Sequence, residues 1–144
     1  NIQTYIQSGN VIFNSAKQGT SPLAKHIQEA IDERYGFKPM ILVLTREEFE
    51  DAIASNPFPE AKNEPKTLHL YFLESPPQEV DLEKLEEVKK SNERFALLGK
   101  VFYLHAPDGI GRSKLAERVE RVLKVSVTAR NWRTVNKIAE MLNG

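Results

Sequence analysis

Hydrophobic and polar positions divide the chain into two stretches, each of which mixes strand and helix patterns. At the start, Gln3–Phe13 is rich in β-branched and aromatic residues on both sides of Gly9-Asn10, which predicts a β-hairpin. Apolar residues at helical spacing then predict a helix that ends at Gly36. Met40–Leu44 is an uninterrupted apolar run of strand length, so we expect a strand in the interior of a sheet.

A helix and a proline-rich segment complete the first stretch. Thr45 and Glu48 have the spacing of a capping box, which predicts a helix that begins after Thr45 and ends near Asn56. Residues 57–66 hold three prolines and show no strand pattern, so we assign them as a connection. Residues 1–56 thus form a first half.

Residues 67–144 form a second half with a more complete series of elements. Alternating or continuous apolar runs predict strands at 67–73, 94–98, 101–105 and 125–129. Helical periodicity predicts helices at 81–90 and 112–124, and a last helix that Asn131 caps and that begins at Trp132.

The order of these elements predicts an α+β fold of two ferredoxin-like halves. Residues 67–144 read β-α-β-β-α-β and then a helix, which is the order of the split βαβ unit. Residues 1–56 read β-β-α-β and then a helix, which is the same unit without its opening strand and helix.

The missing opening strand has a definite place in this interpretation. In a ferredoxin-like sheet the first strand lies between the third and the fourth, so here it would separate Val11–Phe13 from Met40–Leu44. We expect either direct pairing of these two segments in a rearranged sheet, or a gap that another segment or a neighbouring chain fills.

Composition narrows the class of protein. Of the 144 residues, 40% are hydrophobic and 28% charged, which is typical of a globular protein. The absence of cysteine excludes disulfides and thiolate metal sites. No apolar run approaches the roughly 18 residues of a membrane span and no signal peptide is visible, so we expect a cytoplasmic protein with no membrane partner.

The formal charge is zero overall but unevenly distributed. Twenty Lys and Arg against twenty Asp and Glu give no whole-molecule attraction for nucleic acid. Residues 1–99, however, hold 11 basic and 16 acidic residues, whereas residues 100–144 hold 9 and 4. The basic C-terminal part indicates either an anion-binding surface or two halves that neutralise one another.

A glycine-rich loop carries the best-defined candidate chemistry. Gly109 and Gly111 allow the main chain to turn its amides inward just before a predicted helix. These amides, with Arg112, Lys114 and the Ser113 hydroxyl, suit a phosphate or carboxylate. The residue order matches neither the P-loop nor the dinucleotide fingerprint. The alternative is a tight strand-to-helix connection that Ser113 caps.

Arg130 and Asn131 form a second polar cluster, beside Trp132 and Arg133. The ferredoxin-like order allows this cluster and the glycine-rich loop to open at the same end of the sheet, where they would form one site. Trp132 could stack on a nucleic-acid base, but it also starts the apolar stripe of the last helix. We therefore predict that Trp132 belongs to the core.

Neither the histidines nor any catalytic motif indicates a metal site or an enzyme class. His69 and His105 fall in strands that the ferredoxin-like order makes neighbours, but no nearby set of carboxylates completes a zinc site. We predict structural histidines, no metal and no cofactor. The sequence contains no Gly-x-Ser-x-Gly elbow, no His-Glu-x-x-His motif and no recognisable Ser-His-Asp order.

Five segments, taken together, resemble a known family. They are Thr4–Phe13, Asn56-Pro57, Lys66–His69, Asp108–Leu115 and Thr128–Trp132, followed by Thr134 and Lys137. In this order they are similar to the uncharacterised bacterial domain-of-unknown-function family 1697. The resemblance implies two ferredoxin-like halves and brings no established activity or catalytic residue.

Three classes of function follow from these observations. The first is a binding module for a small anionic ligand, such as a nucleotide or other phosphate compound, through Gly109–Lys114 with Arg130 and Asn131. Nucleic acid would bind through the same phosphate contacts. The second is an enzyme in which Ser113 or Lys114 acts on a phosphorylated substrate. The third is a protein-interaction or structural protein without a small-molecule site.

Overall fold

The computed structural model describes residues 2–5, 9–15 and 19–143. The strands are β1 (Ile2–Tyr5), β2 (Asn10–Phe13), β3 (Leu68–Leu73), β4 (Arg94–Leu98), β5 (Val101–His105) and β6 (Val127–Asn131). The helices are α1 (Thr20–Tyr35), α2 (Arg46–Ala54), α3 (Glu83–Val88), α4 (Lys114–Leu123) and α5 (Trp132–Asn143). Three short 3₁₀ helices are η2 (Pro59–Asn63), η3 (Pro65–Thr67) and η4 (Ile110–Arg112).

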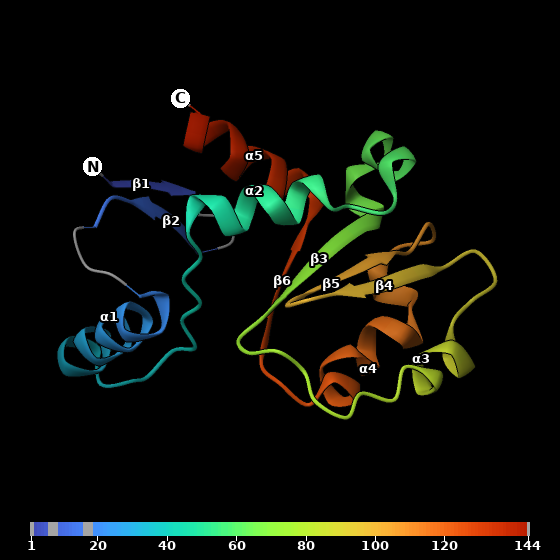
Figure 1. Cartoon of the computed structure of the whole chain (residues 1–144), viewed down its shortest axis with the longest axis horizontal. Helices are drawn as coiled ribbons and strands as arrows, with labels where there is room; N and C mark the ends of the chain where they lie inside the picture. The colour runs from blue at the N-terminus through green and yellow to red at the C-terminus, as the bar shows by residue number, and fades with distance from the viewer. Residues whose placement is uncertain (1, 6–8, 16–18, 144) are drawn as a thin grey trace.

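Four strands of the second half form an antiparallel sheet in the order β4-β5-β3-β6 (Figure 1). The central strand, β3, pairs with β5 on one edge and with β6 on the other, and all six of its residues are buried. The chain order β3-α3-β4-β5-α4-β6 is the one predicted for residues 67–144.

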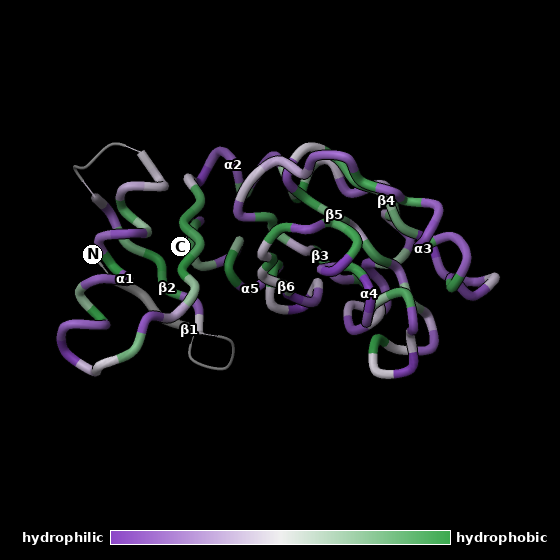
Figure 2. Tube along the Cα trace, turned by 90° about the horizontal axis from the view of Figure 1, so that it is seen from below, coloured by the Kyte–Doolittle hydropathy of each residue, from purple (hydrophilic) through white to green (hydrophobic). Residues whose placement is uncertain are grey.

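Helices cover both faces of this sheet. Side chains alternate along β3, so Leu70 and Phe72 face one side while Tyr71 and Leu73 face the other. The first side packs against α2 and α5, and the second against α3 and α4. Figure 2 shows the hydrophobic stretches gathered around β3 and β5, between these helices.

Helix α2 ties the first half of the chain to this sheet. The predicted capping box is confirmed, because Glu48 N–H donates to Thr45 Oγ1 at 3.0 Å and Thr45 N–H donates to Glu48 Oε1 at 2.9 Å. Phe49 of α2 stacks on Phe72 at 5.9 Å between ring centroids. The Tyr103 hydroxyl donates to a main-chain carbonyl of α2 at 2.6 Å.

The first half has much less buried structure. Its hairpin pairs β1 with β2 in antiparallel register, while residues 6–8 of the predicted turn lie outside the described residues. Helix α1 ends, as predicted, at Gly36 with a left-handed φ of +79°. No side chain of α1 is buried, so this helix adds little to the core.

The prediction of an interior strand at Met40–Leu44 is wrong. Residues 37–45 have no regular secondary structure, and no main-chain hydrogen bond joins Ile41–Leu44 to another described residue. An apolar run forms a strand only when a neighbour completes its hydrogen bonds, and no described strand lies beside this one. The structure is therefore a mixed α/β fold with a four-stranded sheet and a separate hairpin.

Three elements have ends that differ by two residues from those predicted. The last strand is Val127–Asn131 instead of 125–129, and α3 covers Glu83–Val88 instead of 81–90. Helix α4 begins at Lys114, because η4 occupies the preceding residues. Within the described ranges, no helix has the length and apolar character needed to cross a membrane.

Trp132 lies in the core, as predicted, with 6% of its surface exposed. We expect Trp132→Ala to lower the free energy of unfolding by about 3–5 kcal/mol, the range for large core truncations. Arg133→Ala, at the adjacent exposed position, is the control and should change it by less than about 0.5 kcal/mol. Urea denaturation measures both values, and equal losses in the two variants would contradict the buried position.

Candidate functional site

The glycine-rich loop lies between β5 and α4. Gly109 has a φ of +95°, a region that favours glycine, and its N–H donates to the Ala106 carbonyl at 2.9 Å. Gly111 is exposed within η4, and Ser113 N–H donates to the Ile110 carbonyl at 3.1 Å. Two of the loop amides therefore stabilise the loop itself.

Ser113 is a helix cap. Its hydroxyl accepts a hydrogen bond from Ala116 N–H at 3.1 Å, and only 1% of its surface is exposed. Capping satisfies one of the free amides at the start of α4. A nucleophilic role would require this oxygen to leave the cap and reach solvent.

Arg112 and Lys114 differ from Ser113 because both side chains are exposed. Neither takes part in an ion pair within the described part of the chain. They flank the N-terminus of a ten-residue helix, where the helix dipole also favours a bound anion. Asp108 lies at the other end of the loop. Its Oδ2 atom accepts a hydrogen bond from Asn92 Nδ2 at 3.3 Å and forms an ion pair with Lys90 Nζ at 3.8 Å.

Arg130 and Asn131 make their contacts away from the glycine-rich loop. Arg130 Nε donates to Asn10 Oδ1 at 2.9 Å, which joins β6 to β2, and burial lowers the pKa of the guanidinium. Asn131 Oδ1 accepts from Thr134 N–H at 3.0 Å and so caps α5, as predicted. The strand register brings the loop and this cluster to the same end of the sheet. His105, at the end of β5, pairs with Leu68, and Asn131, at the end of β6, pairs with His69, the next residue of β3. The helices that follow, α4 and α5, pack on opposite faces of the sheet.

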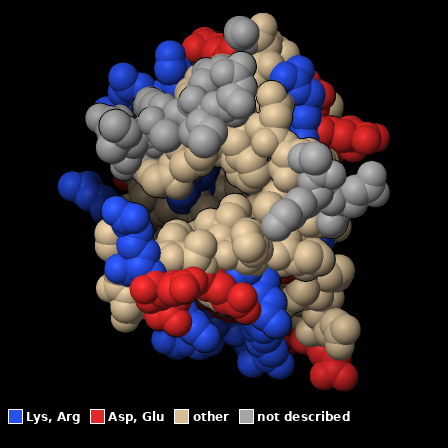
Figure 3. Space-filling view, turned by 90° about the vertical axis from the view of Figure 1, so that its left-hand side faces the viewer, with Lys and Arg blue, Asp and Glu red and all other residues tan. Residues whose placement is uncertain are grey.

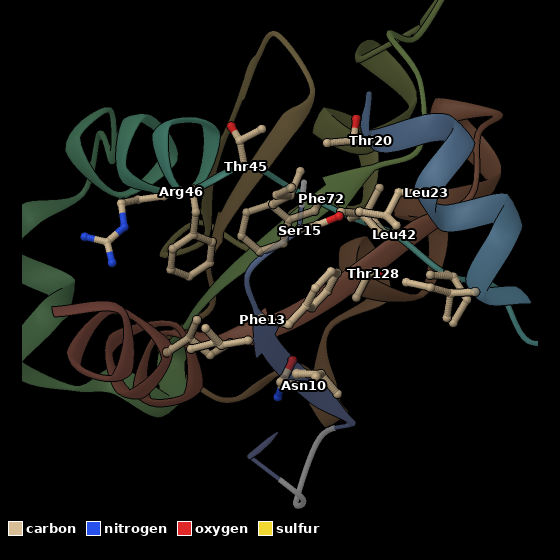
Figure 4. Close-up of a pocket in the computed structure, with 18 of the residues that line it drawn as sticks. Asn10, Phe13, Ser15, Thr20, Leu23, Leu42, Thr45, Arg46, Phe72 and Thr128 are labelled. Carbon is tan, nitrogen blue, oxygen red and sulfur yellow. The ribbon is translucent and has the colours of Figure 1, made fainter. Parts of the chain in front are cut away.

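A groove opens in the first half, and of the predicted binding residues it is lined by Arg130 alone. Figure 3 shows it as a hollow whose lower side is formed mostly by uncharged residues. Its volume is about 650 Å³, and it lies between β2, residues 40–45 and α1. Figure 4 shows Phe13, Leu42 and Phe72 around this space. The predicted order of elements was the signal that could have located it, because that prediction separates Val11–Phe13 from Met40–Leu44.

The groove is lined by polar as well as apolar residues: Asn10, Asn14, Ser15, Thr20, Thr45, Arg46, Thr128 and Arg130 contribute polar groups. Its lining includes Arg46 and Arg130 and, among the described residues, no Asp or Glu. Arg46 donates to the Leu142 carbonyl of α5. The Asn10 Nδ2 atom is buried without a hydrogen-bond acceptor among the described residues.

The two strand histidines do not form a shared site. His105 pairs with Leu68, whereas His69 pairs with Leu104, so the two rings project from opposite faces of the sheet. In the described ranges, no group of three or more His, Asp or Glu side chains is placed to hold a metal ion. His69 is 8% exposed, and burial lowers its pKa to about 4.

This buried histidine predicts a pH dependence of stability. In the unfolded chain His69 binds a proton below pH ~6.5, but in the folded protein only below about 4. Stability should therefore fall as the pH drops through this window, by about 3 kcal/mol in total from this residue. Urea denaturation between pH 7 and pH 4 measures the loss, and His69→Phe should reduce it. An unchanged pH dependence in that variant would contradict the assignment.

Comparison with known proteins places the chain in a family. The sequence model of the family described as "Protein of unknown function (DUF1697)" matches residues 1–103. This range includes the first three segments that carried the resemblance, and it ends before the glycine-rich loop. Neither a curated protein nor a solved structure matches the chain. The chain thus belongs to the DUF1697 family of proteins of unknown function.

Proposed function

We propose that this protein is a binding module for a phosphate-bearing ligand, which it contacts through Arg112 and Lys114. One observation carries the proposal: both side chains are exposed and without an ion-pair partner in the described structure, at the positive end of α4. Gly109 and Gly111 shape the loop, and Ser113 fixes the start of the helix. Arg130 and Asn131 have other contacts, so the loop alone supports the proposal.

The surface of α4 suggests which phosphate compounds fit best. Arg118 and Arg121 are exposed and follow Lys114 at helical spacing along one side of the helix. A ligand with several phosphates, such as a nucleotide or a nucleic-acid backbone, could contact the loop and extend along this side. A cytoplasmic location, where such ligands are abundant, is part of the proposal.

Two observations support binding over catalysis. The Ser113 hydroxyl is engaged as a cap, so the enzyme alternative is left with Lys114. No hydrogen bond or ion pair joins Lys114 to a carboxylate or imidazole of a described residue, which general acid–base chemistry at this amine would use.

The proposal also includes the organisation of the fold. Residues 67–144 form one ferredoxin-like half, and residues 57–66 connect it to residues 1–56. The latter form a second, incomplete half. The support is the order of elements: β1-β2-α1-α2 follows the order of β4-β5-α4-α5, with the apolar residues 40–44 in the place of β6.

The double variant Arg112→Ala/Lys114→Ala tests the binding site. Each charge-assisted contact contributes about 1.5–3 kcal/mol, so loss of both should lower affinity for pyrophosphate or ATP by at least about a hundredfold. The melting temperature should stay unchanged, because neither side chain is buried. Isothermal titration calorimetry at low ionic strength provides the measurement.

The control is Lys25→Ala/Lys38→Ala, which removes the same charge from exposed positions on and just after α1, on the opposite side of the molecule from α4 (Figure 1). This control should retain pyrophosphate affinity within about threefold, because neither side chain lies near the loop. Equal losses in the two double variants would show non-specific attraction by net charge. No binding of either probe by the unmodified protein would also contradict the proposal.

A further inference from the structure

Strand β4 forms one edge of the four-stranded sheet, and no described strand pairs with its outer side. Leu98 and Val101 flank the two-residue turn of the β4–β5 hairpin, so they form a hydrogen-bonded pair. Because hydrogen-bonded and non-hydrogen-bonded pairs alternate along an antiparallel ladder, the N–H and C=O groups of Phe95 and Leu97 face outward. No main-chain hydrogen bond joins these two residues to any other residue that the structure describes.

This edge lacks the usual protection against another strand. Proteins commonly block a free edge with a charged side chain, a proline or a bulge. Phe95-Ala96-Leu97 is uncharged and half-buried, contains no proline, and pairs with β5 without a bulge. The neighbouring Arg94 forms an ion pair with Glu60 and a hydrogen bond with His105 Nδ1 at 3.0 Å, so its charge is engaged within the chain. The outward groups of β4 are therefore available to a further strand.

The edge is complementary to itself. When two copies of β4 lie antiparallel about a two-fold axis at Ala96, Phe95 of each copy faces Leu97 of the other. Each of these two pairs exchanges two main-chain hydrogen bonds, so the outward groups of both residues gain partners. The Phe95 and Leu97 side chains lie on the same face of the sheet, where they form apolar cross-strand pairs.

The remaining side chains of the strand also suit this register. Ala96 faces its own copy at a non-hydrogen-bonded position, where the strands approach most closely and a small side chain fits. Leu98, which is 45% exposed, lies opposite Arg94 of the second copy. The aliphatic part of that arginine side chain can cover it.

Helix α3 adds charge complementarity to the same arrangement. Its Leu85 packs in the apolar cluster that includes Phe95 and Leu97, and Figure 2 shows α3 nearer than α4 to β4. Neighbouring helices lie about 10 Å apart, which is about two strand spacings, so the two copies of α3 become antiparallel neighbours on the joined sheet. Helix α3 contains three Glu and one Lys, and two more Lys follow it: Glu83, Lys84, Glu86 and Glu87, then Lys89 and Lys90. The acidic part of each helix thus lies beside the basic residues of the other, which favours a second copy over an unrelated strand.

We infer that the outer edge of β4 is a docking surface for a second copy of this chain. The two β4 strands pair antiparallel about a two-fold axis at Ala96, and the two four-stranded sheets become one continuous sheet. One pair of strands and one pair of helices bury less surface than a standard interface, so the dimer is weak and reversible. The inference goes beyond the proposed function, because neither Arg112 nor Lys114 takes part in this contact.

The absence of cysteine from the chain makes a cross-linking test direct. Ala96→Cys places the two thiols of the dimer opposite one another, at a Cα separation of about 4.5 Å, which a disulfide can span. The matched control is Leu98→Cys on the same strand, whose side chain is more exposed than that of Ala96. In the proposed register its two copies lie about 13 Å apart along the strands, which is too far for a disulfide. Val11→Cys, at a 55% exposed position in the groove, reports association through the first half.

We expect Ala96→Cys to form a disulfide-linked dimer at least about tenfold faster than either control at equal protein concentration, because the dimer holds its thiols together. Mild oxidation with oxidised glutathione, followed by non-reducing gel electrophoresis, measures the rates. Sedimentation equilibrium of the unmodified protein should show a reversible monomer–dimer equilibrium at concentrations of about 10–500 µM.

Charge substitutions at the axis test the same register without a cross-link. Ala96→Lys or Ala96→Glu alone places two like charges side by side, which should weaken dimer formation at least about threefold. An equimolar mixture of the two variants should recover at least this loss, because Lys and Glu then face one another. A variant that merely failed to fold would not be restored by mixing, so the recovery separates docking from stability.

Three outcomes would overturn the inference. The unmodified protein could remain monomeric throughout this concentration range. Cross-linking at position 96 could be no faster than at position 98, or cross-linking could be fastest at position 11, which would assign self-association to the groove. Finally, the mixture of Ala96→Lys and Ala96→Glu could dimerise no better than each variant alone, which would exclude an axis at Ala96.

Discussion

The main chain of a buried strand must be hydrogen-bonded on every edge from which water is excluded, and β3 is the element that meets this requirement for the second half. Its two ladders bring β5 and β6 together and place apolar side chains on both faces of the sheet. The helices on each face then have a surface on which to pack. The arrangement of the glycine-rich loop, which connects β5 to α4, depends on the same strand.

The first half shows the consequence of lacking such a strand. Its hairpin, helix and apolar segment occur in the same order as their counterparts, yet they form no common sheet in the described structure. They are held instead through α2, whose Phe49 packs on Phe72 of β3, and through the hydrogen bond from Arg130 to Asn10. The groove is the space in the first half that these contacts with the second half leave uncovered.

Features that depend on neighbouring residues were predictable from the sequence, whereas features that depend on distant partners were not. The capping box at Thr45, the left-handed Gly36 and the Asn131 cap are set within a few residues and were predicted. Hydrophobic periodicity was sufficient to place Trp132 in the core. Met40–Leu44 has the composition of a strand, but strand formation depends on a neighbour that no local pattern specifies. For Ser113, the sequence indicates a helix cap as the alternative to an anion site. The burial of Ser113 and the contact of Arg130 with Asn10 could be seen only in the tertiary structure.

The central claim is that Ile41–Leu44, although apolar and of strand length, form no strand because no neighbouring strand completes their main-chain hydrogen bonds. Amide hydrogen exchange of residues 1–144, resolved by residue with NMR, tests it most directly. The account predicts that the amides of Ile41–Leu44 exchange within about tenfold of unfolded-chain rates, while those of Leu70–Phe72 in β3 exchange only through global unfolding. Strong protection of Ile41–Leu44 in monomeric residues 1–144 would show that the segment finds a partner within this stretch of chain, and would contradict the account.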